Sequence, residues 1–280
     1  MMSPELSSYL KQIKLPEPES HKGQNGKVMI LGGSELFHAA SRWSLDVASK
    51  CVDMVFYSSV PSNNELIKEA KGGFWNGIVV EEADIEFYIA QADAILIGPG
   101  MTRTPETQEI TARLLHTFPT KKWVIDAGAL QMIAPEQLTK TCIVTPHLGE
   151  FRWLLGLQEA TEEALTPAQI TELAQAFSQK HDDVCLVIKG HQDVVVRGGE
   201  TVRVEGGNAG MTKGGTGDVL AGLIAGLYAT NDQMTAAVVG SYINKQAGDE
   251  LYKQVGPYFN SSDLVTMIPQ VLWQALQTQI

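Results

Sequence analysis

The sequence of 280 residues predicts an α/β fold: a mainly parallel central sheet covered by helices on both faces. Short apolar runs rich in Val and Ile recur along the chain, each bounded by Gly, Pro or polar residues, as is typical of strands buried on both faces. Amphipathic stretches separate these runs, and this alternation favours right-handed crossovers between parallel strands. No repeat or Pro/Gly/Ser-rich linker interrupts the pattern, so we expect one domain over residues 1–280.

Seven apolar runs predict the parallel strands. In chain order they are Val28–Leu31, Met54–Tyr57, Ile78–Val80, Ala94–Ile97, Trp123–Ile125, Cys142–Val144 and Val184–Ile188. Among the stretches between them, Thr107–His116 and Pro167–His181 have helical patterns. The sequence therefore alternates between strand and helix as far as Lys189.

The pattern changes after Lys189. Asp193–Arg197 and Thr201–Glu205 are separated by Gly198-Gly199-Glu200 and predict a β-hairpin. We expect three helices to close the chain. The first begins near Thr216, and the second runs from about Asp232 to Tyr252. The third has Ser261 and Ser262 as candidate N-caps and reaches Gln279.

Composition and charge exclude several classes of protein. The chain has 21 Lys and Arg against 32 Asp and Glu, a formal net charge of −11, whereas coating a polyanion requires clustered basic side chains. We therefore expect no nucleic-acid or membrane partner. The start has no basic segment followed by an apolar one, and the apolar run Val219–Ala229 is too short to span a bilayer. These features, with three widely spaced cysteines that match no zinc or redox motif, predict a cytoplasmic protein with reduced thiols.

The strongest local signal is the run Asn208-Ala-Gly-Met-Thr-Lys-Gly-Gly-Thr-Gly-Asp218, which a helical pattern follows at once. Gly214, Gly215, Thr216 and Gly217 would expose backbone N–H groups at the positive end of that helix, where a phosphate or an oxyanion can bind. Asp218, in the first helical turn, either caps the helix or acts as a general base. Capping does not need three clustered glycines, so their density favours the base.

Polar residues also follow several predicted strands, at the edge where ligands bind in doubly wound sheets. His147 and Glu150 follow one strand, either as site residues or as an exposed His and a helix-capping Glu. Asp126 follows another and would bind a metal or a ribose, or cap the next turn. Lys189 follows a third, where its ammonium group suits a nucleotide phosphate. The sequence contains neither a Walker loop nor a strand followed by GxGxxG, so this prediction depends on the whole set of motifs.

Taken in order, these motifs resemble the NAD(P)H-hydrate dehydratases, which are ribokinase-like enzymes. The most specific matches are the runs TPHLGE, from Thr145 to Glu150, and NAGMTKGGTGDVLAG, from Asn208 to Gly222; the run ADAILIGPGM supports them. The resemblance implies a three-layer α/β/α sandwich. It also implies a repair reaction in which ADP or ATP drives dehydration of the S epimer of hydrated NADH or NADPH, yielding NAD(P)H, AMP or ADP, and phosphate. Bacterial and archaeal members typically use ADP, which we therefore expect here.

The resemblance also assigns roles to individual residues. It implies that the substrate contacts Ala40, Gly100, His147 and Asp218, and that Asp218 is the catalytic base. The residues implied to contact the nucleotide are Lys189, Gly190, His191, Gln192, Asp193 and Gly217, together with the glycine turn Gly214–Thr216. The family's Asn-x-x-Glu element appears as His147-Leu-Gly-Glu150, so Glu150, with Asp126, is expected to support Mg²⁺ through water.

The resemblance further implies a homo-oligomer. Many members carry an N-terminal epimerase domain, for which the stretch before the first strand leaves no room, so we expect a separate epimerase partner. Two motifs depart from the family. The usual Asp-Ala-Asp-Ala-Leu is Asp126-Ala-Gly128-Ala-Leu130, and residues 35–77 lack both the usual Tyr-x-Gly-Ala and the Ser-Gly-Ala-Gly run.

Two alternatives remain open at this point. One is a ribokinase-like kinase that acts on hydroxymethylpyrimidine, hydroxyethylthiazole or a similar small alcohol. The other is a catalytically silent nucleotide-binding protein, which the missing acid at Gly128 would favour. The sequence leaves undetermined the choice between ADP and ATP, and between the NADH and NADPH hydrates.

Overall fold

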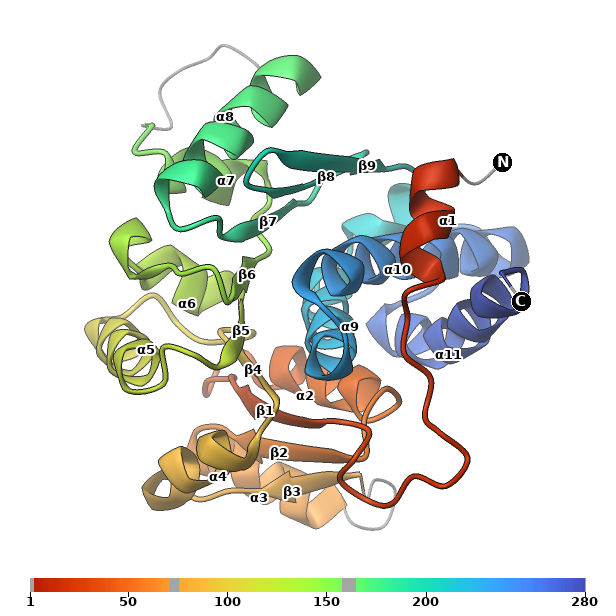
Figure 1. Cartoon of the computed structure of the whole chain (residues 1–280). Coiled ribbons are helices and arrows are strands. Elements are labelled where there is room, and N and C mark those ends of the chain that lie inside the picture. The colour runs from red at the N-terminus through yellow and green to blue at the C-terminus, as the bar shows by residue number, and fades with distance from the viewer. Residues whose placement is uncertain (1–2, 71–75, 158–164, 280) are drawn as a thin grey trace.

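The computed structural model describes residues 3–70, 76–157 and 165–279, and its centre is a nine-stranded sheet (Figure 1). The strand order is β3-β2-β1-β4-β5-β6-β7-β8-β9; β1 to β7 pair in parallel, and β8 and β9 are antiparallel. The strands are β1 Lys27–Leu31, β2 Met54–Ser58, β3 Gly77–Val79, β4 Ala94–Ile97, β5 Lys122–Ile125, β6 Cys142–Val144, β7 Cys185–Ile188, β8 Asp193–Arg197 and β9 Glu200–Val204. Every predicted strand is present, with bounds that differ by at most one residue.

Helices cover both faces of the sheet, which confirms the predicted α/β/α layers (Figure 1). One layer consists of α4 Ile85–Gln91, α5 Pro105–Thr117, α6 Ala127–Met132, α7 Leu148–Leu154 and α8 Pro167–Lys180. The other contains α1 Pro4–Leu10, α2 His38–Ala48, α9 Thr216–Thr230, α10 Gln233–Val255 and α11 Ser261–Gln277. Helix α3 Pro61–Glu69 lies near the β3 edge, and short 3-10 turns occur at Glu82–Asp84, Pro135–Gln137 and Ala209–Thr212.

Successive strand residues alternate between two hydrophobic clusters, one on each face of the sheet. On β5, Trp123 and Ile125 join the cluster under α4 to α8, whereas Val124 joins the cluster under α2, α9 and α10. Because side chains alternate along a strand, a strand covered on both faces needs apolar residues at every position. This requirement explains the continuous apolar runs of the sequence.

Helix α9 is buried over most of its surface, and glycines allow its neighbours to approach. A Cβ atom on Gly222 would lie 2.6 Å from the Cα atom of Ser44 in α2. One on Gly226 would lie 2.8 Å from the Cβ atom of Cys51. These close contacts fix α9 against α2, so the first turn of α9 has a defined position at the carboxyl edge of the sheet.

The closing helices differ from the prediction at one cap. The N-cap of α11 is Asn260, not Ser261 or Ser262, because its side chain accepts hydrogen bonds from the backbone N–H groups of Ser262 and Asp263. The Asp263 carboxylate accepts in return from the Asn260 N–H group, which completes a capping box. Ser261 is instead buried and points toward the glycine turn, as described below.

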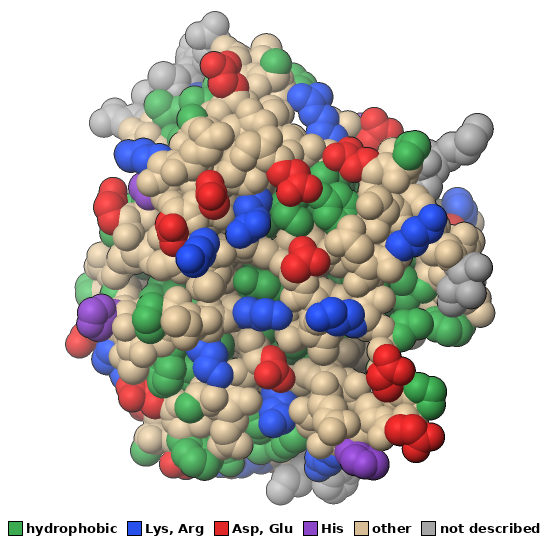
Figure 2. Space-filling model, in the orientation of Figure 1, with side chains coloured by type: hydrophobic (Ala, Val, Ile, Leu, Met, Phe, Trp, Pro, Cys, Tyr) green, Lys and Arg blue, Asp and Glu red, His purple; other side chains and the backbone are tan. Residues whose placement is uncertain are grey.

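The surface carries mixed charges on the face shown in Figure 2, where basic side chains are interspersed with acidic ones. Within residues 3–70, 76–157 and 165–279, no helix is long and apolar enough to cross a membrane. Cys142 and Cys185 are buried, Cys51 is partly buried, and all three are free thiols.

Candidate active site

Three neighbouring strands end in polar residues whose side chains share one face of the sheet. Asp126, Thr145 and Lys189 each stand two positions after an apolar residue of the cluster under α9, namely Val124, Ile143 and Val187. Side chains two residues apart on an extended strand point to the same face. The three polar residues therefore face the layer of helices that contains α9.

Lys189 joins the sheet edge to the first turn of α9. Its Nζ atom donates a hydrogen bond to Asp126 Oδ1 at 2.9 Å, and Asp126 is 2% exposed. A Cβ atom on Gly217 would lie 3.4 Å from the same Nζ atom. Burial lowers the pKa of Lys189, but the negative charges of Asp126 and Glu150 outweigh it, so the pKa is raised. The side chain therefore carries a positive charge beside the helix N-terminus.

The glycine turn before α9 is held by contacts that leave little freedom. Gly215, the N-cap of α9, has φ = +98°, and a Cβ atom there would lie 2.3 Å from the Trp43 ring. Ser261 donates a hydrogen bond to the Gly214 carbonyl at 3.0 Å, and Thr216 donates one to the Met211 carbonyl at 2.8 Å. The first N–H groups of a helix have no partner within it, so this fixed turn can present them to an anion.

Asp218 occupies the third position of α9, and Gly215 rather than Asp218 is the N-cap. Burial raises the pKa of Asp218 to about 7, with a further increase from the Asp126 charge that Lys189 partly offsets. A general base is most effective when its pKa lies near the operating pH. The position and pKa of Asp218 favour the base over the cap.

His147 and Glu150 form a capping box at the start of α7. The Glu150 N–H group donates to His147 Nδ1 at 3.1 Å, and the His147 N–H group donates to Glu150 Oε2 at 2.8 Å. Gln131 donates to Glu150 Oε1 at 2.6 Å. The capping interpretation is thus correct as a description of their contacts. The His147 side chain is still 59% exposed, so its ring is accessible to a ligand.

A buried cation organises the turn between β7 and β8. Lys245 on α10 donates hydrogen bonds to the carbonyl groups of Gly190 at 2.9 Å, His191 at 3.2 Å and Gly206 at 3.2 Å. Its Nζ atom also lies 3.1 Å from Asp193 Oδ1, which accepts the Gly190 N–H group at 2.9 Å. The chain therefore holds Gly190, His191 and Gln192 in a fixed turn beside Lys189.

Asp193 was predicted among the nucleotide contacts, but its carboxylate is engaged within the protein. The residue is 4% exposed, and Ser241 donates to its second oxygen at 2.6 Å. Lys245 was not singled out from the sequence. A Lys in an apolar helical stretch is a weak signal, although Lys is rarely buried without a partner.

Ala40 and Gly100, the predicted substrate contacts, lie together at the ends of α2 and β4. A Cβ atom on Gly100, where φ is +75°, would lie 3.1 Å from the Ala40 Cβ atom and 2.5 Å from the Phe37 carbonyl oxygen. Ser44, one helical turn after Ala40, donates a hydrogen bond to the Asp218 carbonyl at 2.8 Å. Helix α2 thus connects these two positions to Asp218.

Two departures from the family motifs have structural correlates. A Cβ atom on Gly128 would lie 2.1 Å from the Met101 carbonyl oxygen, so the backbone of the loop after β4 occupies the space of a side chain. The unusual segment 35–77 forms α2, β2 and α3 and begins β3, and its residues 71–75 lie outside the described ones. Helix α2 begins after Phe37 without a side-chain cap.

Oxygen ligands for a cation are present, although no three His, Cys, Asp or Glu side chains within the described part of the chain are grouped to hold a metal directly. Mg²⁺ usually keeps several waters and is held by one or two carboxylates plus substrate phosphates. Asp126 and Glu150 fit that role through water. Thr145 was overlooked as an individual residue; its buried hydroxyl lacks a hydrogen-bond partner among the described residues.

The fold is similar to that of solved ribokinase-like α/β proteins. A ribokinase-like superfamily protein from Enterococcus faecalis superposes with a TM-score of 0.82 at 24% identity, over 98% of this chain and 95% of that one. The Bacillus subtilis ADP/ATP-dependent NAD(P)H-hydrate dehydratase, co-crystallised with ATP/Mg²⁺, gives 0.79 at 23% identity over 97% of each chain.

Sequence comparison gives the family. The model of the NAD(P)H-hydrate dehydratase family matches residues 28–270, and the chain belongs to this family. An ADP-dependent (S)-NAD(P)H-hydrate dehydratase from Xanthomonas campestris is 32% identical over 94% of this chain and 93% of its own length. A bifunctional NAD(P)H-hydrate repair enzyme from Methanocaldococcus jannaschii is 34% identical over 94% of this chain. The match covers 51% of that relative, so the chain spans about half of its length.

Proposed function

We propose that this protein dehydrates the S epimer of hydrated NADH or NADPH and uses ADP, giving NAD(P)H, AMP and phosphate. One observation carries the proposal: Asp218, with a pKa near 7, stands in the first turn of α9 beside Lys189. Membership of the dehydratase family and the names of its ADP-dependent relatives support it.

Two groups of residues bind the two ligands, ADP and the hydrated dinucleotide. Lys189, Gly217 and the backbone of the glycine turn hold the terminal phosphate of ADP, and the turn Gly190–Gln192 contacts the rest of the nucleotide. Ala40, Gly100 and the exposed ring of His147 hold the hydrated dinucleotide with its hydroxyl group toward Asp218. Both ligands then meet at the N-terminus of α9.

The chemistry requires conversion of a poor leaving group into a good one. The hydrate has a hydroxyl group on the ring carbon beside the nicotinamide nitrogen. Asp218 accepts the hydroxyl proton while the oxygen attacks the β-phosphoryl group of ADP, which forms an O–P bond and releases AMP. The ring nitrogen lone pair then expels phosphate, and loss of a ring proton restores the dihydropyridine. Lys189 and the helix N-terminus stabilise the charge on the transferring group.

We expect Mg²⁺ to accompany the nucleotide, supported through water by Asp126 and Glu150. When bound, the ion neutralises the charge of the phosphate groups. Asp126 already pairs with Lys189, and both Glu150 oxygens accept hydrogen bonds, so the protein holds these carboxylates in place before any ligand binds.

Reconstitution tests the proposal. Purified protein is mixed with NADH hydrate and Mg²⁺, and recovery of NADH is followed by its absorbance with ADP, with ATP and without nucleotide. We expect recovery that requires ADP and one phosphate released for each NADH formed. A stable phosphorylated alcohol without free phosphate would instead indicate a small-molecule kinase, and no recovery with any nucleotide would contradict the proposal.

The variant Asp218→Asn tests the role of the base. The amide keeps the shape of the side chain but cannot accept the proton, so we expect turnover to fall by about 10²- to 10⁴-fold. Binding of ADP, measured by calorimetry, should change little. Turnover near that of the wild type would contradict the assignment.

The same proposal includes a homo-oligomer and a separate epimerase that supplies the S hydrate, as in the family resemblance. Light scattering measures the first. For the second, a purified NAD(P)H-hydrate epimerase should increase NADH recovery from a mixture of both epimers to completion, whereas this protein alone should consume only one epimer.

A further inference from the structure

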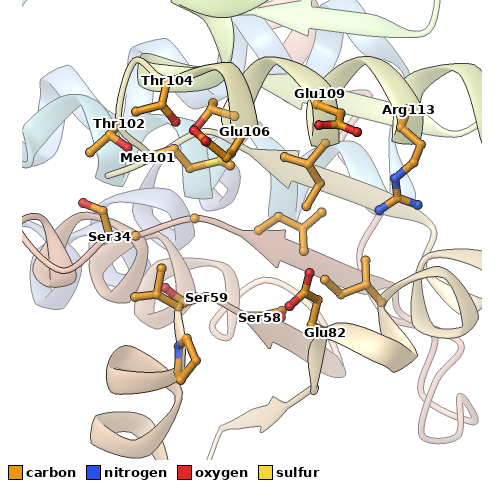
Figure 3. Close-up of a pocket in the computed structure, with 18 residues that line it drawn as sticks. Ser34, Ser58, Ser59, Glu82, Met101, Thr102, Thr104, Glu106, Glu109 and Arg113 are labelled. Carbon is orange, nitrogen blue, oxygen red and sulfur yellow. The ribbon is translucent and has the colours of Figure 1, made fainter.

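A cavity of about 530 Å³ opens at the carboxyl edge of the sheet, between the ends of β1, β2 and β4 (Figure 3). The chain leaves β1 toward β2 in one direction, whereas β4 lies on the other side of β1. The crevice between β1 and β4 is therefore the topological switch point of the sheet, where open α/β sheets bind ligands. The volume lies within the range of about 300–1,000 Å³ found for small-molecule sites.

The cavity adjoins the proposed substrate contacts. Gly33 lines it, and the Gly33 N–H group donates a hydrogen bond to the Pro99 carbonyl at 2.7 Å. Gly100, the next residue, is close enough that its added Cβ atom would lie 3.1 Å from both Gly33 Cα and Ala40 Cβ. Ala40 and Gly100 therefore lie directly beside the Gly33 edge of the cavity.

The two ends of the cavity differ in chemistry. Ser34 and Thr102 lie at one end in Figure 3, and Ser59 below them, so hydroxyl groups face the side nearest Gly33. Glu109 and Arg113, both on α5, lie at the opposite end. Apolar side chains such as Ile85 and Ile110 line the space between helices and sheet. A polar sugar and an apolar base fit such a lining.

The charged groups at the cavity are predominantly acidic. Among the described residues that line it, Glu82, Glu106 and Glu109 are acidic and Arg113 is the one cation, and Arg113 already pairs with Glu86. In dinucleotide sites a carboxylate accepts a hydrogen bond from the ribose 2′-hydroxyl, whereas a 2′-phosphate requires a nearby Arg. Carboxylates repel a phosphate, and a guanidinium engaged by Glu86 offers little compensation.

We propose that this cavity binds the adenosine half of the hydrated dinucleotide and selects the NADH hydrate over the NADPH hydrate. The inference rests on the proposed function for the identity of the ligand. It assigns a role to Glu82 and Glu109, which sequence motifs did not single out.

The test compares the two dinucleotides in binding and in turnover. Dissociation constants of NADH and NADPH are measured by the fluorescence of the dihydronicotinamide, and kcat/KM is measured for both hydrates with ADP. We expect the wild type to prefer the unphosphorylated form by about tenfold or more, which corresponds to about 1.4 kcal/mol. The double variant Glu82→Gln/Glu109→Gln should reduce the preference severalfold by improving NADPH binding.

Two further variants sharpen the result. Glu109→Arg adds a cation at the far end and should reverse the preference. Because Glu109 is exposed, we expect this variant to keep the stability of the wild type. Glu69→Gln removes an exposed carboxylate of α3 that does not line the cavity and should leave the preference unchanged.

Equal dissociation constants for NADH and NADPH in the wild type, or an unchanged preference in both cavity variants, would overturn the inference. Failure of the proposed function gives a different result. In that case neither hydrate is converted, while the NADH preference in binding and its response to Glu109→Arg persist.

Discussion

Lys189 Nζ and Asp126 Oδ1 lie 2.9 Å apart, and this ion pair connects the ends of β7 and β5 across β6. The pair has two consequences. Asp126 keeps Lys189 protonated close to Gly217, and the Asp126 charge helps to raise the pKa of Asp218 to about 7. The Asp126 carboxylate thus influences the protonation of both the cation proposed to bind the phosphate and the base proposed to accept the hydroxyl proton.

The pH dependence of turnover follows from the pKa of Asp218. The base works when deprotonated, so we expect kcat/KM to fall about tenfold per pH unit below pH 7 and to level off above it. Asp126→Asn removes a neighbouring negative charge and should move the midpoint to lower pH, although it also lowers activity. A rate profile from about pH 5 to 9 measures both midpoints, and an unchanged midpoint in Asp126→Asn would contradict this coupling.

The raised pKa of Asp218 also predicts that this side chain lowers the stability of the folded protein near neutral pH. The folded pKa of Asp218 lies above its ordinary value of 3.8, so folded protein holds a proton that the unfolded chain releases between about pH 4 and 7. Stability from this group is therefore lost as pH rises toward 7. Asp218→Asn has no charge to bury and should be more stable at pH 8 by at most about 4 kcal/mol. Urea unfolding at about pH 5 and pH 8 measures the difference, which should be smaller at the lower pH; an equal gain at both would argue against a raised pKa.

Lys245 should affect nucleotide binding without touching the nucleotide. Lys245→Met removes the donor to Gly190 and His191 and leaves Asp193 buried without its cation, so we expect about 3–5 kcal/mol lower stability. The loosened turn should raise the KM for ADP about tenfold, with a smaller effect on kcat. Lys253→Met is the control, because Lys253 lies on the same helix in an exposed ion pair with Glu250, and exposed pairs contribute little to stability. A lower melting temperature with an unchanged KM would reduce Lys245 to a purely structural role.

Restoring the family's second acid should harm this protein. In Gly128→Asp the new Cβ atom would lie 2.1 Å from the Met101 carbonyl oxygen and must displace the loop that carries Gly100. We expect a loss of about 1–3 kcal/mol in stability and a higher KM for the hydrate. Gly128→Ala introduces the same Cβ atom without charge and should behave alike. Higher activity in Gly128→Asp would contradict this expectation and show that a second acid at this position assists catalysis.

The sequence by itself determined the strands, the hairpin, the order of the closing helices and the position of Asp218. These features follow from local rules: a strand buried on both faces must be apolar throughout, and a turn that exposes N–H groups to an anion needs glycine. The predicted N-caps of the last helix, Ser261 and Ser262, were wrong by one and two positions, because the side chain of Asn260 accepts the first N–H groups.

The tertiary structure alone decided which partners these residues meet. Asp193 and Lys245 are far apart in the chain, and nothing local marks them as a buried pair. The protonation of Asp218 depends on its burial and on the charges of Asp126, Lys189 and Glu150. Whether a side chain fits at position 128 depends on the path of the loop after β4. Electrostatic and steric effects act across space, so local sequence rules place a side chain on an element but do not give it its neighbours.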